Sequence, residues 1–151
     1  ISVKIAEKGL CPYPKPPLIV VESDAGAGKS FLIDVLSQVL ESEFRAAGNN
    51  IDYPYIMKGA YTAKAAKIID GRTLTSLLNL SFGNNLVSLG DKLRDWKREM
   101  LQNLKIWIID EYSLVKIDML YQIDSRLKEI MCNNLPFGGI SVILFGNILQ
   151  L

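Results

Sequence analysis

The stretch LIVVESDAGAGKS, residues 18–30, decides the fold of this 151-residue chain. A short apolar run that is rich in β-branched residues predicts a buried strand, and the glycines at 26 and 28 predict a tight turn after it. The next residues, FLIDVLSQVL, have a pattern typical of a helix. Strand, glycine-rich turn, Lys29-Ser30 and helix, in this order, indicate a phosphate-binding loop.

The loop has a chemical task for each of its parts. Its backbone N–H groups and the helix N-terminus attract a phosphate chain, Lys29 is expected to reach the β- and γ-phosphates, and the Ser30 hydroxyl is expected to ligate Mg²⁺. The predicted nucleotide-binding residues are Ser23, Asp24, Ala25, Gly26, Ala27, Gly28, Lys29 and Ser30. The alternative is an ordinary strand-to-helix turn that uses its glycines for geometry.

Two residues depart from the GxxxxGK[ST] pattern of such loops. Ser23 stands where the pattern has glycine, and Asp24 places a carboxylate close to the expected phosphate. Two like charges about 4 Å apart repel by about 1 kcal/mol in water and by about 4 kcal/mol at an effective dielectric near 20. The Asp24 carboxylate therefore opposes nucleotide binding by the loop.

Composition excludes several classes of protein. Hydrophobic residues make up 49% and charged residues 22% of the chain, which is ordinary for one globular domain. The net charge of +1 gives no global attraction to nucleic acid, so such binding needs a local patch. Apolar runs reach only about four or five residues, against about 18 for a membrane span, so no membrane partner is expected. The absence of histidine excludes Ser-His-Asp and Cys-His catalysis and most zinc sites, and two cysteines without metal spacing suit a reducing compartment.

The rest of the chain alternates strands with helices. After an irregular, proline-rich leader at 1–17, strands are predicted at 18–22, 51–57, 105–109 and 140–145, and helices at 29–47, 62–69, 73–80, 91–103 and 117–131. Phe31, Val35 and Val39 are expected to face inward from the first helix. Dense strands separated by helices predict an α/β fold with a parallel sheet covered on both faces, whose ligands bind at the carboxyl ends of the strands. Because the chain begins at Ile1 and stops just after a strand-like run, we expect a fragment or one domain of a longer protein.

Acidic and amide residues follow two later strands. In IWIIDE, residues 106–111, Asp110 is expected to hold the metal through water and Glu111 to orient and deprotonate an attacking water. Gln150, after the last strand, is a candidate sensor of the γ-phosphate. The predicted catalytic residues are Lys29, Glu111 and Gln150, and the predicted metal ligands are Ser30 and Asp110. Taken alone, the acidic pair also fits a solvated strand end, and the Gln150 region also fits a plain strand exit.

Together with these elements, several motifs resemble one family. SDAGAGKS (23–30) is similar to Gly-Pro-Ala-Gly-Thr-Gly-Lys-Ser, GAYTAKAA (59–66) to Thr-Ala-Pro-Thr-Gly-Lys-Ala-Ala, and IIDEYSL (108–114) to Ile-Ile-Asp-Glu-Ile-Ser-Met. GRTLTS (71–76), PFGG (136–139) and GNILQL (146–151) follow the same family's pattern. From residue 18 to the end, the chain resembles the Pif-type (petite integration frequency) superfamily-one DNA helicases, which are related to RecD-like helicases.

The resemblance implies a P-loop NTPase fold and a motor function. Residues 18–151 would be the first RecA-like domain of a helicase that uses ATP and Mg²⁺ to move 5′ to 3′ along single-stranded DNA. Thr62, Lys64, Thr73 and Ser76 would contact the DNA backbone. The second RecA-like domain, a partner that supplies an arginine for hydrolysis, is absent from this sequence, so the chain alone is expected to unwind nothing and to hydrolyse ATP slowly at best. Family roles in DNA repair, recombination and telomere maintenance would follow, with a nuclear or mitochondrial, and in any case intracellular, location.

Departures from the family pattern keep two other functions open. They are Ser23, Asp24 and Ala27 in the phosphate loop, Tyr61 and Ala63 in the next motif, Thr75 in place of His, and Asn147 in place of Asp. Core patterning is retained while chemical positions change, which favours a non-catalytic module as the alternative function. An unrelated phosphate-loop enzyme such as a small-molecule kinase is the third possibility, although no acceptor-substrate lid is recognisable.

Overall fold

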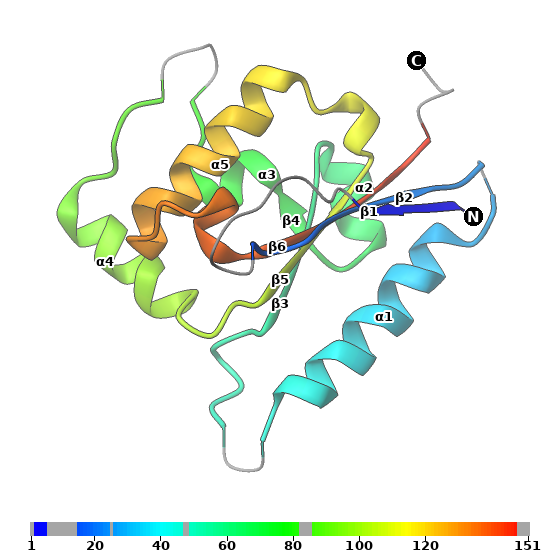
Figure 1. Ribbon diagram of the computed structural model, residues 1–151, viewed down its shortest axis with the longest axis horizontal. Helices are drawn as coiled ribbons and strands as arrows, with labels where there is room; N and C mark the ends of the chain where they lie inside the picture. Colours follow the sequence, from blue (N-terminus) through cyan, green and yellow to red (C-terminus); the bar gives the residue numbers. More distant parts are fainter. Residues whose placement is uncertain (1, 6–14, 25, 47–48, 82–85, 148–151) are drawn as a thin grey trace.

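The computed structural model describes residues 2–5, 15–24, 26–46, 49–81 and 86–147. These residues form a six-stranded sheet with helices on both faces (Figure 1). The strands are β1 (Ser2–Ile5), β2 (Leu18–Glu22), β3 (Ile56–Ala60), β4 (Arg72–Thr73), β5 (Ile106–Asp110) and β6 (Ser141–Gly146). Their order is β1-β2-β6-β5-β3-β4, and only the β1–β2 pair is antiparallel. The predicted parallel sheet and α/β fold are therefore confirmed.

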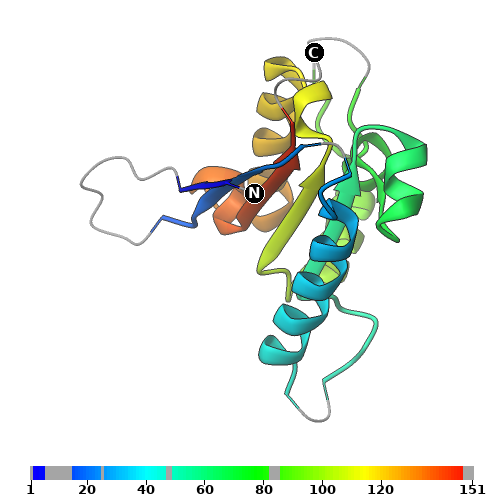
Figure 2. The same cartoon turned by 90° about the vertical axis from the view of Figure 1, so that its right-hand side faces the viewer.

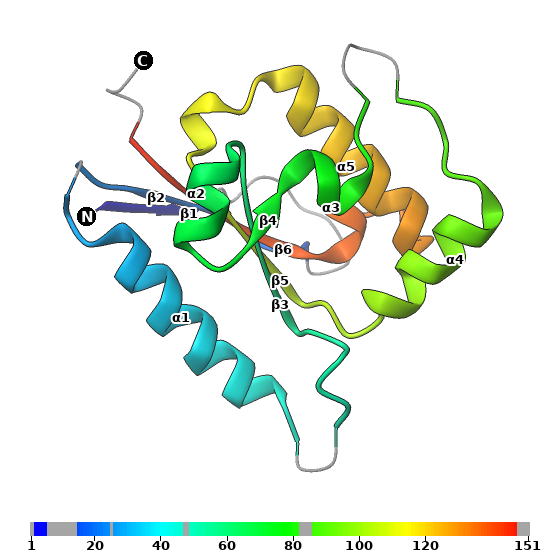
Figure 3. The same cartoon turned by 180° about the vertical axis from the view of Figure 1, so that it is seen from behind.

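The helices divide between the two faces of the sheet. One face is covered by α1 (Lys29–Phe44) and α2 (Ala63–Ile68), and the other by α3 (Leu74–Leu78), α4 (Asp91–Met100) and α5 (Ile117–Met131). Short 3₁₀ turns lie at Tyr112–Leu114 and Pro136–Gly139. In Figure 2 the central strands lie between α1 and α5, and Figure 3 shows α3, α4 and α5 from behind. No helix in the described parts of the chain combines the length and apolar composition needed to cross a membrane.

Alternation along the central strands produces two hydrophobic cores. Trp107 and Ile109 of β5 pack with α3 and α5, whereas Ile108, on the opposite side of the same strand, packs with α1 and α2. Successive side chains of a strand point to opposite faces, so a fully apolar strand can serve two cores at once. The dense run at 106–109 is therefore the centre of the fold.

The first helix presents a different face from the one predicted. Phe31 is 75% exposed and Val39 is 51% exposed, whereas Ile33 is fully buried against the sheet. The prediction that Phe31, Val35 and Val39 face inward was wrong. Apolar residues occupy more than one stripe of FLIDVLSQVL, so helical spacing alone could not select the stripe that meets the sheet.

The strand predicted at 51–57 also needs correction, because β3 runs from Ile56 to Ala60. Residues 51–53 form a turn in which the Asn50 side chain accepts a hydrogen bond from the Asp52 N–H, at 2.9 Å. Further along, Gly59 lets α3 approach the sheet, since a Cβ there would lie 3.0 Å from both Leu74 and Trp107. β3 contains Lys58 and Gly59, so its second half lacks the apolar pattern that predicts a strand.

The other boundaries agree closely with prediction. Helix α5 begins and ends as predicted, and β2 matches its predicted range, while α4 stops three residues before the predicted position 103. Residues 2–5 form the edge strand β1, where the sequence suggested an irregular leader. Apolar residues alternate with Ser2 and Lys4 in this segment, which is the pattern of a half-buried strand.

Candidate active site

The predicted site residues that the structure describes lie at one edge of the sheet. Because β2, β6, β5, β3 and β4 are parallel, their carboxyl ends lie together. In the register, Ala60 pairs with both Asp110 and Thr73, and Glu22 pairs with Gly146. The phosphate loop, the acidic pair and the segments after β3 and β4 therefore all begin at this edge.

The loop between β2 and α1 has the geometry that its glycines suggest. Gly26 and Gly28 have φ values of 76° and 81°, a left-handed conformation that other residues rarely adopt. A Cβ at either position would meet no atom within 4 Å, so the loop faces open space there. Gly28 caps α1 without a side-chain hydrogen bond, and no acidic residue lies in the first helical turn. The first N–H groups of α1 are therefore available to an anion.

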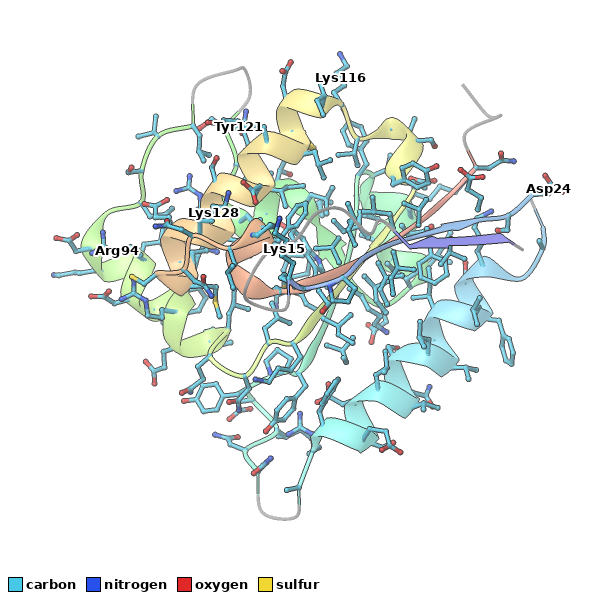
Figure 4. The ribbon with its side chains drawn as sticks, viewed as in Figure 1. Lys15, Asp24, Arg94, Lys116, Tyr121 and Lys128 are labelled. Atoms are coloured by element: carbon cyan, nitrogen blue, oxygen red, sulfur yellow. The ribbon has the colours of Figure 1, made fainter. Side chains whose placement is uncertain are left out.

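Lys29 folds back over its own loop. Its Nζ donates to the backbone oxygens of Asp24, at 3.2 Å, and Ser23, at 3.5 Å. Asp24 itself is exposed, at the tip of the loop after β2 (Figure 4). Ser23 is 8% exposed, its N–H donates to the Gly146 carbonyl at 3.2 Å, and its Oγ has no hydrogen-bond partner among the described residues. Ala25 lies outside the described residues.

The acidic pair ends β5 in two different environments. Asp110 is 6% exposed, and burial raises the pKa of its carboxyl group, with a smaller rise from the Glu111 charge. The Glu111 N–H, which donates to Asp110 Oδ1 at 2.9 Å, and the positive charge of Lys29 oppose this rise in pKa. Lys29 therefore acts electrostatically on Asp110, which joins the phosphate loop and the acidic pair into one site.

Asp110→Asn should stabilise the fold near neutral pH. Burial raises the pKa of Asp110 in the folded state above the ordinary value of about 3.9, so the ionised carboxylate destabilises the fold at any pH above that raised pKa. The gain should shrink as pH falls through the folded-state pKa and vanish below about pH 3.9. Urea unfolding across this range measures it, with the exposed Glu43→Gln as control. A gain that is the same at every pH would contradict the prediction.

The segment after β3 reaches the acidic pair directly. Thr62 caps α2: its Oγ1 accepts from the Ala65 N–H at 3.2 Å and donates to Glu111 Oε2 at 2.9 Å. Glu111 has a left-handed backbone, with φ 55°. The structure thus brings together a residue predicted to contact DNA and a residue predicted to be the catalytic base. Lys64, two residues after Thr62, is exposed.

Thr73 and Ser76 lie beside this contact, at the start of α3. Thr73 Oγ1 donates to Ser76 Oγ at 2.9 Å and accepts from the Ser76 N–H at 3.4 Å. They line a surface hollow of about 350 Å³ together with Lys67 and Arg72. Sequence reasoning assigned no role to Arg72, although its position directly before Thr73 was a usable signal.

The last two candidate residues follow β6. Asn147 follows β6 at the same edge and is partly buried, and Gln150 lies outside the described residues. Within the described ranges, no group of three or more Cys, Asp or Glu side chains could enclose a metal ion. A metal here would therefore need ligands from a bound phosphate as well as from Ser30 and Asp110.

Comparison with known proteins decides the family. A family model described as PIF1-like helicase matches residues 11–151, which is nearly the whole chain. The chain belongs to the PIF1-like helicase family. Its similarity therefore extends beyond the phosphate loop to all the motifs at this edge of the sheet.

Individual members of the PIF1-like family resemble the chain at a similar level. It is 30% identical to the ATP-dependent DNA helicase RRM3 of Saccharomyces cerevisiae over 130 residues, covering 84% of this chain and 17% of that protein. It is also 30% identical to human PIF1 over 137 residues, covering 88% of this chain and 19% of PIF1. The chain thus spans less than a fifth of the length of these two relatives.

Solved PIF1 structures share the fold. Bacteroides Pif1 in complex with ADP-AlF3 and single-stranded DNA matches with a TM-score of 0.68 and 30% identity, over 87% of this chain and 28% of that one. Candida albicans Pif1 matches with a TM-score of 0.68 and 26% identity, over 87% of this chain and 29% of that one. The sheet and its helices are therefore a RecA-like domain of the PIF1 type.

Proposed function

We propose that the chain is the first motor domain of an ATP-dependent DNA helicase that moves 5′ to 3′ along single-stranded DNA. The observation that carries this proposal is the convergence of Lys29, buried Asp110 and Glu111 at one sheet edge. Membership of the PIF1-like family supports it, as does the Bacteroides relative solved with ADP-AlF3 and single-stranded DNA.

The residues present fit Mg²⁺ and ATP. The open loop at Gly26 and Gly28 offers backbone N–H groups. Within the described residues, Lys29 Nζ donates to loop carbonyl oxygens, which a phosphate oxygen can replace as acceptors. The Ser30 hydroxyl and the Asp110 carboxylate are hard oxygen ligands of the kind Mg²⁺ prefers, with phosphate and water completing the shell. Bound Mg²⁺ would neutralise charge that develops on the phosphates.

Each residue then has one role in hydrolysis. Lys29 binds the β- and γ-phosphates, Glu111 accepts a proton from the attacking water, and Gln150 senses the γ-phosphate. The arginine that such reactions require would come from a second RecA-like domain, and it is worth about 10³–10⁵ in rate in related nucleotidases. We expect the chain alone to hydrolyse ATP slowly and to show no strand displacement.

The DNA contacts in the proposal are backbone contacts. Thr62, Lys64, Thr73 and Ser76 offer hydroxyl groups and one cation beside the active site. The hollow at α3 is lined by two cations, Lys67 and Arg72, and one carboxylate, Asp70, so its side chains carry a net positive charge. Such groups bind phosphates without reading bases. The full protein would act inside the cell in DNA repair, recombination or telomere maintenance.

A titration with a fluorescent Mg·ATP analogue tests the proposal. The wild-type chain should bind saturably, and Lys29→Ala should lower the affinity at least tenfold, because it removes the cation that meets the phosphates. Lys92→Ala is the control, since Lys92 is exposed on α4 on the far side of the fold from α1. Equal affinities of the wild-type and Lys29→Ala proteins would refute the assignment of the loop.

A non-catalytic module is the second candidate function. The observation that favours it is Asp24, whose carboxylate sits in the phosphate loop, together with Asn147 in place of a family aspartate. Absence of nucleotide binding by the folded wild-type chain would select this alternative.

A further inference from the structure

The Thr62 hydroxyl links the two functions assigned to this edge of the sheet. It donates a hydrogen bond to Glu111 Oε2 at 2.9 Å and accepts one from the Ala65 N–H at 3.2 Å. The Glu111 backbone has a left-handed conformation, and its N–H donates to Asp110 Oδ1 at 2.9 Å. The hydrogen bond from Thr62 therefore acts on the Glu111 side chain, whose carboxylate it orients.

A DNA phosphate and Glu111 compete for the same proton. A threonine hydroxyl carries one hydrogen, and both a phosphate oxygen and an ionised carboxylate can only accept. A phosphate that accepts a hydrogen bond from Thr62 must use the hydroxyl hydrogen that now points to Glu111. The contact between Thr62 and DNA and the contact between Thr62 and Glu111 are mutually exclusive.

We propose that Thr62 is a positioning residue that holds Glu111 in a resting orientation until a backbone phosphate of single-stranded DNA replaces Glu111 as the acceptor of the Thr62 hydroxyl hydrogen bond. The inference rests on the proposed function, since it requires that Thr62 contacts DNA and that Glu111 is the base. DNA binding then frees the carboxylate to accept a proton from water. By linkage, the Thr62–Glu111 hydrogen bond weakens DNA binding by the same factor by which DNA binding weakens that hydrogen bond.

Thr73 supplies a matched control within the same domain. It too begins a short helix after a parallel strand and is a predicted DNA contact, but its hydroxyl donates to Ser76 rather than to a carboxylate. Replacing Thr73 should therefore weaken DNA binding without any coupling to Glu111.

A double-mutant cycle on DNA affinity tests the proposal. The dissociation constant of a fluorescein-labelled oligothymidylate is measured by anisotropy at one fixed low salt concentration for wild type, Glu111→Ala, Thr62→Val and the double variant. With Thr62 present, Glu111→Ala should lower the dissociation constant about tenfold. With Thr62→Val also present, the same substitution should lower it by no more than about twofold. Loss of the Glu111 negative charge raises affinity in both backgrounds, so the cycle cancels that effect. With Thr73→Val in place of Thr62→Val, the effects should multiply.

Hydrolysis gives the second measurement. Without DNA, Thr62→Val should raise the single-turnover rate of ATP hydrolysis severalfold, whereas mere loss of the α2 cap would not raise it. Thr62→Ser keeps the hydroxyl and should retain the coupling to Glu111→Ala. If the wild type binds DNA and the effects of Glu111→Ala and Thr62→Val on the dissociation constant simply multiply, this inference is wrong. The proposed function would then still stand. Failure of the wild type to bind the oligothymidylate would overturn the proposed DNA contact and the inference together.

Discussion

Replacing Arg126 with methionine should lower the free energy of unfolding by about 3–5 kcal/mol, the usual cost of breaking a buried ion pair by removing one partner. Arg126 is 1% exposed on α5 and pairs with Glu129, while its Nη2 donates to the carbonyls of Asn79, at 3.2 Å, and Val87, at 2.7 Å. Glu129 in turn accepts from the Leu89 N–H at 2.8 Å. The pair therefore connects the segment between α3 and α4 to α5. Methionine would leave the Glu129 carboxylate without its cation and would remove the donor to the Asn79 and Val87 carbonyls.

Urea unfolding of the chain measures this loss, and Arg94→Met is the matched control. Arg94 also lies in an i,i+3 ion pair, with Asp91, but on the surface of α4 (Figure 4). Exposed pairs contribute about 0–1 kcal/mol, so the control should change stability little. Arg126 also lowers the pKa of Lys97, after the larger effect of burial, so its removal relieves some repulsion. A loss for Arg126→Met no larger than the loss for Arg94→Met would show that the buried network does not stabilise the fold.

Local sequence patterns predicted the elements whose signals are complete within one segment. Helix α5 matched from end to end because Ile123, Leu127 and Ile130 form a single apolar stripe, and all three are fully buried. The phosphate loop matched because its positive φ values require glycine at 26 and 28. In α1, by contrast, apolar residues lie on several sides, and only packing on the sheet selects Ile33.

Contacts that depend on strand order could not be predicted from local sequence patterns. β3 and β5 are neighbours in the sheet although α2, β4, α3 and α4 separate them along the chain. The pairing of Ala60 with Asp110 brings Thr62 to Glu111, two residues that the sequence assigned to different tasks. Arg126 was likewise invisible as a core residue, because a charged position on an amphipathic helix ordinarily faces solvent. The sequence could supply the residues of the site, but the pairing of distant strands supplies their connections.

Replacing Glu111 with glutamine should abolish most of the ATP hydrolysis that the chain supports, by about 10²–10⁴-fold, which is the usual contribution of a positioned general base. Glutamine cannot take the proton from water, yet its side-chain oxygen can still accept the Thr62 hydrogen bond, so the local structure should persist. Affinity for the Mg·ATP analogue should stay within about twofold of wild type, because a base that acts only in the transition state adds little to ground-state binding.

Single-turnover hydrolysis with excess protein, with and without oligothymidylate, measures the effect of Glu111→Gln even if the chain turns over slowly. Glu43→Gln removes an exposed carboxylate from the far end of α1 and should hydrolyse ATP at the wild-type rate. If Glu111→Gln bound the analogue normally and hydrolysed ATP as fast as Glu43→Gln, Glu111 would not be the base. If Glu111→Gln also lost nucleotide binding, its carboxylate would be needed in the ground state. Loss of hydrolysis with intact binding is the one result that places Glu111 at the attacking water, because Asp110 and Lys29 remain unchanged beside it.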